Sequence, residues 1–464
     1  MSTNLIGKKL MGNIYNSLKT VFQNLIKENT SNSSFIPTLL VLVTIPLSFA
    51  INNIALALFL LVVLLTFKKS NFKFKINLIL PITLYFLMVV SYFWTIDKKS
   101  TLSGISTEIF LFLIPLAFLL AKDFSVTQRQ KLISFFSYSI VILVSYFSIR
   151  AIVRYYMLDD IRVFFYHGEN EDDYGLVPKL LNAIHVSVFV SVAFFHFFTK
   201  EIKSKADYTI SVVLFGFLLL LSSKNMVLAV IFLVLIYTFF FSKSAHKMRL
   251  RNLIVFGLLI AIVFSIGRIK QRFQVEFQTN TNKSLSTNVI EGIPAGVHYV
   301  SIKEAWTNET FTPNDYFNGT AFRVYQLRIF KELIVEENVF LTGFGLNASL
   351  LKIKEKAFQY NLYMGKDGNS GYQTKNFHNQ YVQVFAELGI FGFVLLLTML
   401  MINIKNAFKS KDFIHFVFAF LMISLFLTES FLWRQRGVVF FTLLYCLFNS
   451  GIVLNNSRQE QKII

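Results

Sequence analysis

The chain has 464 residues, of which 54% are hydrophobic, and its mean hydropathy is +0.56. A water-soluble protein of this length carries far more polar surface, so the composition predicts an integral membrane protein. The net charge of +19 lies mostly in short clusters between apolar runs, where basic residues set topology and face anionic lipid. Nucleic-acid binding is therefore not expected, and the single Cys446 excludes a disulfide or thiolate metal site within one chain.

Residues 1–34 are polar and amphipathic, with apolar side chains from Ile6 to Leu25 on one helical face and lysines largely off it. This pattern predicts an interfacial helix on the cytoplasmic leaflet, with a solvated tail as the alternative. A cleavable signal peptide is not expected from such a segment.

Apolar runs then predict an all-α polytopic protein with about twelve transmembrane helices, several shorter than the ~20 residues of a perpendicular span. Nine lie within residues 35–267 and three within 378–454. The runs cover residues 36–50, 53–67, 76–95, 105–121, 131–150, 180–198, 208–222, 225–241, 252–267, 378–402, 413–429 and 437–454. Alternatively, the first two form one hairpin broken around Asn52 and Asn53.

Basic residues are distributed unequally between the loops. With a cytoplasmic N-terminus, the five short inner loops hold seventeen Lys and Arg residues and the four short outer loops hold five. The positive-inside rule therefore predicts that both termini, including the tail 455–464, are cytoplasmic.

Two longer segments are predicted on the outer side, an acidic loop at 151–179 and an insert at 268–377. The insert is too long to be a mere connection, so we expect a mainly helical domain. Within it, residues 320–337 and 346–360 have helical spacing, and Gly343-Phe344-Gly345 interrupts the chain between them. The buried face of the first helix is predicted to comprise Phe322, Tyr325, Ile329 and Leu333.

The tenth predicted span begins with a polar stripe. Asn379, Gln383 and Glu387 share one face of an otherwise apolar helix. A polar face is costly in hydrocarbon, so it should look into the bundle or a wet cavity. Ordinary interfacial polar residues are the alternative.

Ionisable residues of the predicted spans gather toward their outer ends. They are His185, Lys224, Glu387, Glu429, Arg434 and Arg436. Their common depth predicts one site open to the outer side, whereas a pump or proton-coupled transporter more often places such groups near mid-membrane.

Three motifs follow one another in the second half of the chain. They are Ser222-Ser223-Lys224, then Arg323 with Thr342-Gly343-Phe344-Gly345 downstream, then Phe377-His378-Asn379-Gln380-Tyr381 leading to Ala386-Glu387-Leu388-Gly389. With these motifs the chain resembles the O-antigen ligase and polymerase superfamily, bacterial membrane glycosyltransferases of the GT-C type. The resemblance covers residues 210–450 at motif level and the whole chain in topology.

The resemblance implies transfer of a glycan from undecaprenyl diphosphate on the periplasmic face of the inner membrane, without a metal or cofactor. The acceptor is the lipid A core in ligases and another lipid-linked repeat unit in polymerases. By the same likeness His378 matches an essential histidine, and Arg323 an essential arginine that binds the donor diphosphate. Lys224 stands where family members often have arginine.

The chemistry of these residue types agrees with the implied roles. Fixed cations stabilise the charge that develops on a diphosphate leaving group, and arginine binds phosphate oxygens in two places. Lys224 offers a point charge without that fork. Histidine is suited to accept a proton from an acceptor hydroxyl near neutral pH, and attack opposite the leaving group would invert the anomeric centre. The residues expected to support this site are Asn379, Gln380, Tyr381, Gln383, Glu387, Gly343 and Gly345.

Each main candidate also has a structural alternative. His378 would merely cap a helix, Arg323 would lie on a solvated face, and Lys224 would extend to lipid headgroups. A transporter of lipid-linked glycans or anions is the alternative from another functional class. It predicts polar groups through the whole bilayer depth and tolerance of His378→Ala.

Structural roles are favoured for the remaining polar residues. Arg434 and Arg436 are expected to anchor the last outer turn, and His185 to be a hydrogen-bonded packing residue. The acidic residues at 159–160 and 171–173 have the oxygen ligands of a divalent-cation site, but a solvated acidic loop is favoured.

Overall fold

The protein is described here by a computed structural model. The described residues are 16, 19–72, 74–165, 175–178, 180–242, 254, 257–258, 261, 297–366 and 369–451. A helical segment at residues 19–31 comes first. It is followed in chain order by α2 (Phe35–Thr44), α3 (Phe49–Leu65), η1 (Lys69–Asn71), α4 (Ile76–Val90), η2 (Ser91–Phe93), α5 (Lys98–Glu108), α6 (Phe110–Leu120), α7 (Val126–Leu158), η3 (Ile161–Phe164), α8 (Ala183–Phe198), α9 (Lys205–Leu220), α10 (Lys224–Ile236), η4 (Tyr237–Phe241), β1 (His298–Val300), α13 (Ile302–Thr307), β2 (Asp315–Phe317), α14 (Gly319–Glu336), α15 (Ser349–Gln359), β3 (Gly365–Lys366), β4 (Asn369–Ser370), η7 (Tyr372–Thr374), α16 (Gln380–Ser410), α17 (Phe413–Phe426), η8 (Phe431–Trp433) and α18 (Gln435–Asn449).

The helical membrane architecture expected from the sequence is confirmed. Within the described ranges, five helical segments are long and apolar enough to cross a membrane, and four apolar helices are shorter. The long ones are Ile76–Phe93, Lys98–Leu120, Val126–Leu158, Lys224–Phe241 and Gln380–Ser410. The total of twelve spans stays a prediction, because most of the run at 252–267 lies outside the described residues.

The first two apolar runs form a hairpin, but its break is not at Asn52. The chain turns at residues 45–48, and Asn52 is a buried residue inside α3. Its side-chain Nδ2 donates to the Val41 carbonyl at 3.1 Å and to Thr44 Oγ1 at 3.0 Å. The amide is therefore satisfied by the end of α2 and has no reason to interrupt its own helix.

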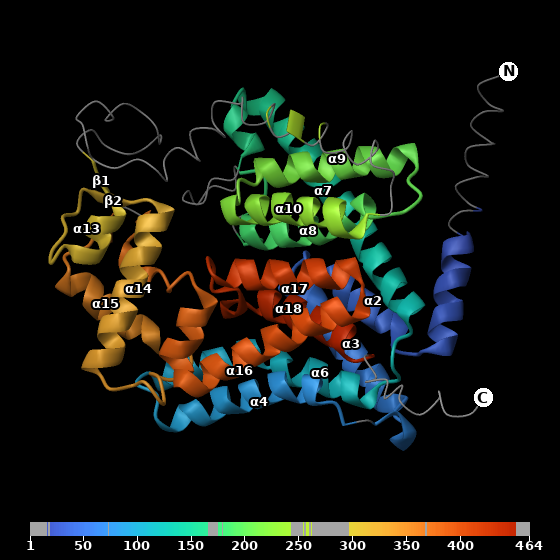
Figure 1. The fold of residues 1–464 in the computed structure, drawn as a ribbon, viewed down its shortest axis with the longest axis horizontal. Coiled ribbons are helices and arrows are strands. Elements are labelled where there is room, and N and C mark those ends of the chain that lie inside the picture. The colour runs from blue at the N-terminus through green and yellow to red at the C-terminus, as the bar shows by residue number, and fades with distance from the viewer. Residues whose placement is uncertain are drawn as a thin grey trace.

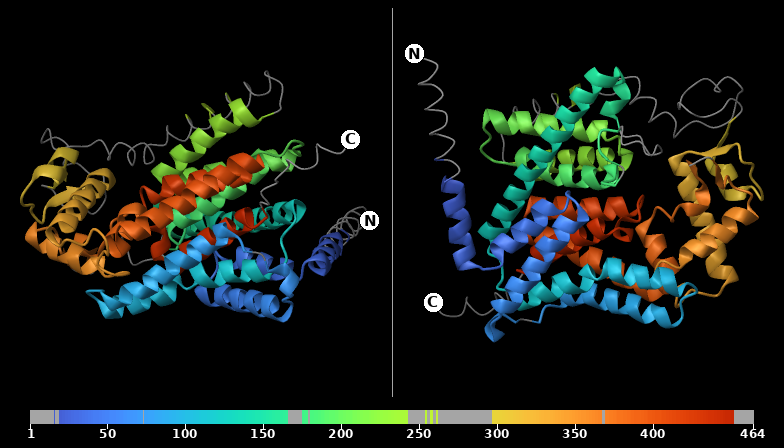
Figure 2. Two further views of the ribbon diagram at one scale, coloured as in Figure 1. Left: turned by 60° about the horizontal axis from the view of Figure 1, so that its bottom comes forward. Right: turned by 180° about the vertical axis from the view of Figure 1, so that it is seen from behind.

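Contacts between distant loops define the two ends of the bundle. At one end Trp94 Nε1 donates to the Thr342 carbonyl, and at the same end the insert packs against α16. At the other end Asn32 Nδ2 donates to the Lys122 carbonyl, and Arg129 Nη1 to the Phe448 carbonyl. The loop after α4 and the loop after α6 thus lie at opposite ends, while the orientation of the chain in the membrane stays a prediction. Figures 1 and 2 show the insert (gold and orange) at one end and the helical segment 19–31 (dark blue) near the other.

Only part of the predicted interfacial helix can be compared with the structure. Ile6 and most of its apolar partners lie outside the described residues. In the described part, Val21, Phe22 and Ile26 are exposed. These exposed apolar side chains are compatible with a helix that lies on a lipid surface.

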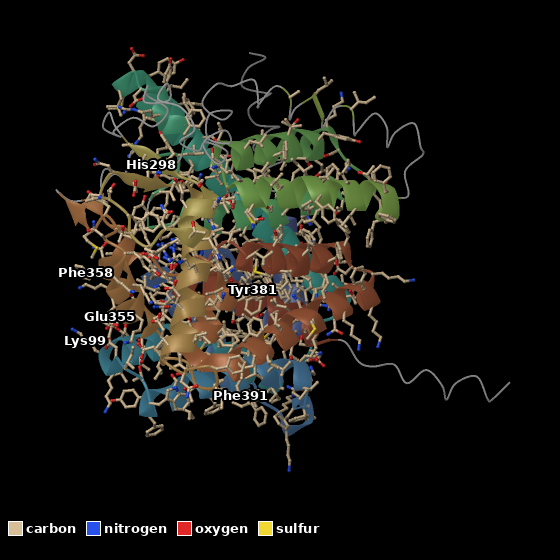
Figure 3. All side chains as sticks on the ribbon, turned by 60° about the vertical axis from the view of Figure 1, so that its left-hand side comes forward. Lys99, His298, Glu355, Phe358, Tyr381 and Phe391 are labelled. Carbon is tan, nitrogen blue, oxygen red and sulfur yellow. The ribbon has the colours of Figure 1, made fainter. Side chains whose placement is uncertain are left out.

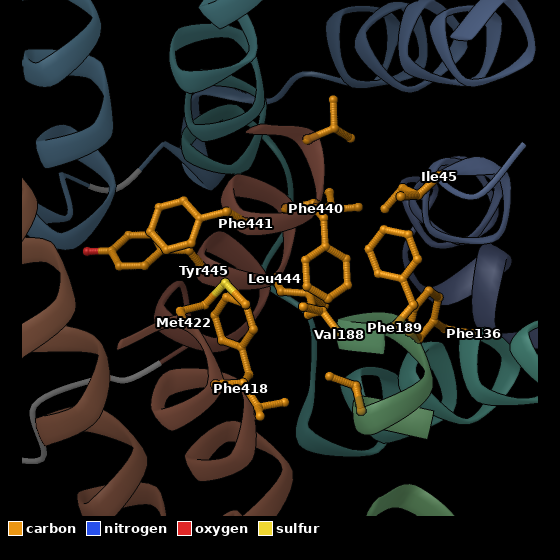
Figure 4. Close-up of a cluster of buried hydrophobic side chains, with 14 of the residues drawn as sticks. Ile45, Phe136, Val188, Phe189, Phe418, Met422, Phe440, Phe441, Leu444 and Tyr445 are labelled. Atoms are coloured by element: carbon orange, nitrogen blue, oxygen red, sulfur yellow. The ribbon is translucent and has the colours of Figure 1, made fainter. Parts of the chain in front are cut away.

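The bundle core is rich in phenylalanine. Phe440 of α18 lies 4.7 Å (ring centroids) from Phe189 of α8 and 6.2 Å from Phe136 of α7 (Figure 4). Phe418 of α17 contacts Phe441 of α18 in the same core. Such tilted aromatic pairs combine large buried area with favourable ring geometry, so α7, α8, α17 and α18 form a firm support for their connecting turns.

The described part of the insert, residues 297–366 and 369–377, has its own hydrophobic core. The predicted helix is confirmed as α14, and its four predicted face residues are all buried. The insert is not purely helical, since β1 pairs parallel with β2, and β3 antiparallel with β4. Phe317 of β2 packs on Tyr325 of α14 at 5.5 Å, which fixes this strand pair against the helix.

Candidate functional site

His378 lies immediately before α16 in a backbone conformation that is uncommon for a residue with a side chain. Its φ angle is +46°, in the left-handed region. Asn379 caps the helix, because its side chain accepts hydrogen bonds from the backbone N–H groups of Tyr381 and Val382. The capping role suggested for His378 thus belongs to its neighbour, and the imidazole is 29% exposed.

Glu429 is the polar partner of that imidazole. It lies in the turn between α17 and α18, and its carboxylate Oε2 is 3.4 Å from His378 Nδ1. Burial alone would raise the pKa of the Glu429 carboxyl. The hydrogen bond and charge of His378, with the charge of Arg323, outweigh burial and lower that pKa below its usual value. Glu429 is therefore an anion fixed beside the histidine.

Arg323 approaches the same turn from α14. Its Nε and Nη2 donate to the Thr428 carbonyl at 3.1 and 2.9 Å, and its Nη1 donates to the Gly319 carbonyl at 2.8 Å. Three hydrogen bonds to backbone oxygens fix the plane of the guanidinium. The solvated-face alternative is not supported, because Arg323 joins the insert to the membrane bundle.

Lys224 lies at the start of α10, and the next residue of the chain contacts the same turn. It is the first residue of α10 and is half-buried. The next residue, Asn225, donates from Nδ2 to the Ser424 carbonyl and to Thr428 Oγ1, both at 2.8 Å. The α17–α18 turn therefore lies beside the start of α10.

Residues 423–432 are called here the outer turn. Each of the three motifs contacts this turn, either directly or through an adjacent residue. Besides the contacts above, the start of α16 is bound to this turn by three side chains. Asn379 Nδ2 donates to the Leu427 carbonyl, Tyr381 Oη donates to the Ile423 carbonyl, and Gln380 Oε1 accepts from the Leu432 N–H. Figure 3, which brings the insert forward, labels Tyr381.

The polar stripe faces inward, as expected. Gln383 and Glu387 are both buried. Gln383 Nε2 donates to Glu387 Oε1 at 2.5 Å and to Ser349 Oγ at 3.1 Å, and its Oε1 accepts from the Phe377 N–H at 3.3 Å. These residues fasten the segment before His378 to α16 and to α15.

Glycines allow the insert to pack against α16 backbone to backbone. Gly343 and Gly345 have φ angles of +67° and +97°, and Gly389 has +65° at a kink within α16. A Cβ atom on Gly343 would lie 2.4 Å from the Glu387 carbonyl carbon, and one on Gly389 2.1 Å from the Leu341 oxygen. Gly343 and Gly345 thus position the site by close approach, a role glycine alone allows.

With this geometry described, the comparison with known proteins can be stated. Residues 209–397 match the O-antigen ligase family (Wzy_C). This region, which is less than half of the chain, is similar to an O-antigen ligase domain. The superfamily assignment expected from the motifs is thereby confirmed, and with it an O-antigen ligase or polymerase type of function. No curated protein matched the chain.

The matched region contains Lys224, Arg323 and His378, but the outer turn lies beyond its end at residue 397. The family match therefore covers Lys224, Arg323 and His378, whereas only the tertiary contacts bring Thr428 and Glu429 to the site. Sequence reasoning noted Glu429 only as a charged residue bordering the last outer turn, and it gave no role to Thr428 or Asn225. A lone carboxylate in an apolar turn was the available signal, but its partner was not deducible from spacing.

Arg436, which is buried, holds the turn between α2 and α3 and the segment before α8 against the start of α18. Its guanidinium donates to the carbonyls of Ile45, Leu47 and Leu180, each at 2.9 Å. The expected anchoring role is correct, but it acts through backbone carbonyls and not through lipid headgroups. Arg434 is exposed at the start of α18.

His185 packs under the outer turn. Its ring stacks on Phe431 with centroids 4.4 Å apart, which agrees with a packing role. The expected hydrogen bond is not found, since neither ring nitrogen has a partner among the described residues.

The acidic loop is only partly described. Asp160 Oδ2 pairs with Arg162 Nε at 2.6 Å, and Asp159 ends α7 with φ of +47°. Residues 166–174, including the run at 171–173, lie outside the described residues. Within the described chain, no three His, Cys, Asp or Glu side chains gather as a metal site.

Proposed function

We propose that the protein transfers a glycan from undecaprenyl diphosphate to a lipid A core or similar acceptor on the periplasmic face of the bacterial inner membrane. His378 is the general base, and Arg323 and Lys224 hold the donor diphosphate. The observation that carries this proposal is that Arg323 and His378, 55 positions apart in the sequence, bind consecutive residues, Thr428 and Glu429. A base and a phosphate-binding cation thus share one turn.

In the proposed step an acceptor hydroxyl oxygen attacks C1 of the donor sugar. The bond between C1 and the diphosphate oxygen breaks, and the diphosphate leaves with the bonding electrons. His378 takes the hydroxyl proton, and the fixed negative charge of Glu429 stabilises the imidazolium that results. Attack opposite the leaving group inverts the anomeric centre, so the product's stereochemistry tests this step.

The two cations have different parts in this scheme. Three backbone hydrogen bonds hold the Arg323 guanidinium plane, so little freedom is lost when phosphate oxygens bind. Lys224, at the N-terminus of α10, adds a point charge together with the positive end of the helix dipole.

We further propose that transfer needs no metal ion. The donor already carries an activated diphosphate, and the charge that develops on it is met by side-chain cations. Activity that persists in excess chelator supports this part of the proposal. Loss of activity in chelator, restored by Mg²⁺ or Mn²⁺, would contradict it.

The direct experiment uses purified protein in nanodiscs with lipid-linked donor and acceptor glycolipid. His378→Ala should abolish product formation while the protein stays folded. Glu309→Gln changes an exposed residue of the insert and serves as the control with normal activity. Normal turnover by His378→Ala would remove the histidine from the mechanism and would favour the transporter alternative.

A polymerase of the same superfamily is the second candidate, because it would use the same donor and the same retained histidine and arginine. Deletion of the gene distinguishes the two. Loss of a ligase leaves long chains on undecaprenyl diphosphate and a bare lipid A core. Loss of a polymerase leaves single repeat units attached to the acceptor.

A further inference from the structure

Gln326 is a buried amide without a hydrogen-bond partner beside the proposed site. It lies on α14 three residues after Arg323, about 4.5 Å further along the helix axis. The side chain is 1% exposed, and neither Nε2 nor Oε1 has a partner among the described residues. Buried amides are normally paired, so this one requires a reason.

The neighbours of Gln326 show which segment packs on its face of α14. Residues four apart share a helix face, so Phe322 and Phe330 flank Gln326 on the same face. The Phe322 ring is 6.0 Å from the His378 ring, and the Phe330 ring is 6.0 Å from the Phe377 ring. The Phe377–His378 segment therefore packs on the face of α14 that also carries Gln326.

The Phe377–His378 segment is held by contacts to side chains. The backbone N–H of Phe377 donates to the Gln383 side chain, and that of His378 donates to the Asn376 side chain. Lifting the segment from α14 would break the Phe377–Gln383 bond and unpack the buried Phe377 side chain, but it would break no helix or strand pair. Such a movement would expose Gln326 one helical turn from Arg323.

We propose that Gln326 binds the donor sugar attached to the diphosphate. Its amide both donates and accepts, which suits a sugar hydroxyl pair or an N-acyl group. This inference rests on the proposed function, because a sugar linked to phosphates at Arg323 lies one helical turn from Gln326. Methionine has similar size and would avoid the cost of an unpaired amide, so glutamine here serves the ligand and not the fold.

The experiment measures binding of two lipids to the full-length protein in nanodiscs. One is undecaprenyl diphosphate without sugar, and the other is the lipid-linked glycan extracted from the producing cells. Gln326→Met should weaken binding of the glycan-bearing lipid about 3- to 10-fold, the loss of one or two ordinary hydrogen bonds. It should leave the affinity for undecaprenyl diphosphate unchanged and should keep or raise Tm.

Two further variants complete the design. Tyr325→Phe is the control, because it also removes a buried polar group that has no hydrogen-bond partner among the described residues. The Tyr325 ring packs in the insert core, so the affinities for both lipids should stay normal. Gln326→Asn keeps the amide but withdraws it by one methylene, and it should show the same selective loss as Gln326→Met.

Two results would overturn the inference. Equal affinity of Gln326→Met and wild type for the glycan-bearing lipid, especially with a lower Tm, would mean that the amide is structural. Equal weakening of both lipids would mean that it does not contact the sugar. If instead Arg323→Gln bound both lipids normally, the proposed function would fail, whatever Gln326 does.

Discussion

The Nδ1 atom of His378 lies 3.4 Å from the carboxylate of Glu429, and this pair joins the start of α16 to the turn between α17 and α18. The backbone of His378 is left-handed, with a φ angle of +46°, immediately before the cap of α16 at Asn379. Strained backbone of this kind persists where the surrounding contacts determine it, and here the cap at Asn379 and the outer turn do so.

Replacing Glu429 should slow the transfer reaction. The lowered pKa of its carboxyl keeps Glu429 ionised at neutral pH, where its charge can stabilise the imidazolium that His378 forms when it accepts the hydroxyl proton in the proposed step. Glu429→Gln should lower kcat about 10- to 100-fold by removing a charged hydrogen bond. The measurement is kcat with lipid-linked donor and acceptor at saturating concentrations. A kcat equal to that of the wild type would show that the carboxylate does not assist His378.

The same pair gives a stability prediction. A carboxyl whose folded-state pKa is lowered contributes stability above its unfolded pKa, and that contribution is lost as pH falls through the folded-state value. Wild-type Tm should therefore fall below about pH 4.5. Glu429→Gln should lack this part of the acid dependence. Identical Tm profiles from pH 3 to pH 7 would contradict the linkage.

Arg323→Lys should separate geometry from charge. Lysine keeps the cation but cannot reproduce the fork that binds the Thr428 carbonyl through two nitrogens. We expect KM for the lipid-linked donor to rise about 10-fold, with a smaller change in KM for the acceptor. Lys224→Arg is the matched comparison and should retain activity. A donor KM unchanged in Arg323→Lys would argue against phosphate binding there.

Gly343→Ala and Gly389→Ala should disrupt the packing of the insert on α16. Each residue has positive φ, and an added Cβ would meet backbone atoms within 2.4 Å. The expected cost exceeds about 1–3 kcal/mol and should appear as a lower Tm together with lost activity. Gly216→Ala is the control, because nothing lies within 4 Å of its Cβ position and it sits inside α9. That variant should be neutral or slightly stabilising.

Arg436→Lys should destabilise the protein without a specific effect on donor affinity. Lysine cannot reach the three carbonyls that the buried guanidinium binds. Leaving some of them unpaired costs roughly 2–4 kcal/mol. Arg434→Lys, at the exposed neighbouring position, should leave Tm within about 1 °C, because exposed substitutions are usually near neutral. Equal Tm values for the two variants would contradict this role of Arg436.

Several features were predictable because they are local. Apolar composition required a membrane protein, and the 3.6-residue period gave α14 with its buried face. The inward direction of Gln383 and Glu387 followed from the cost of polar groups in hydrocarbon. The motifs around Lys224, Arg323 and His378 indicated the superfamily.

Other features depend on where distant segments meet. Asn52 was a plausible hairpin break by composition, yet its amide is satisfied by α2, and the turn occurs at residues 45–48. The short strands β1 and β2 exist only because the insert core brings residues 298–300 beside 315–317.

By itself the sequence determined the membrane class, the direction of the helix faces and the residue types available for chemistry, since these follow from composition and short-range periodicity. Tertiary structure alone decided that His378 pairs with Glu429, that Arg323 binds Thr428, and that Gln326 is left without a partner. Each of these depends on packing between elements more than fifty residues apart or on a covered surface, which no local pattern specifies.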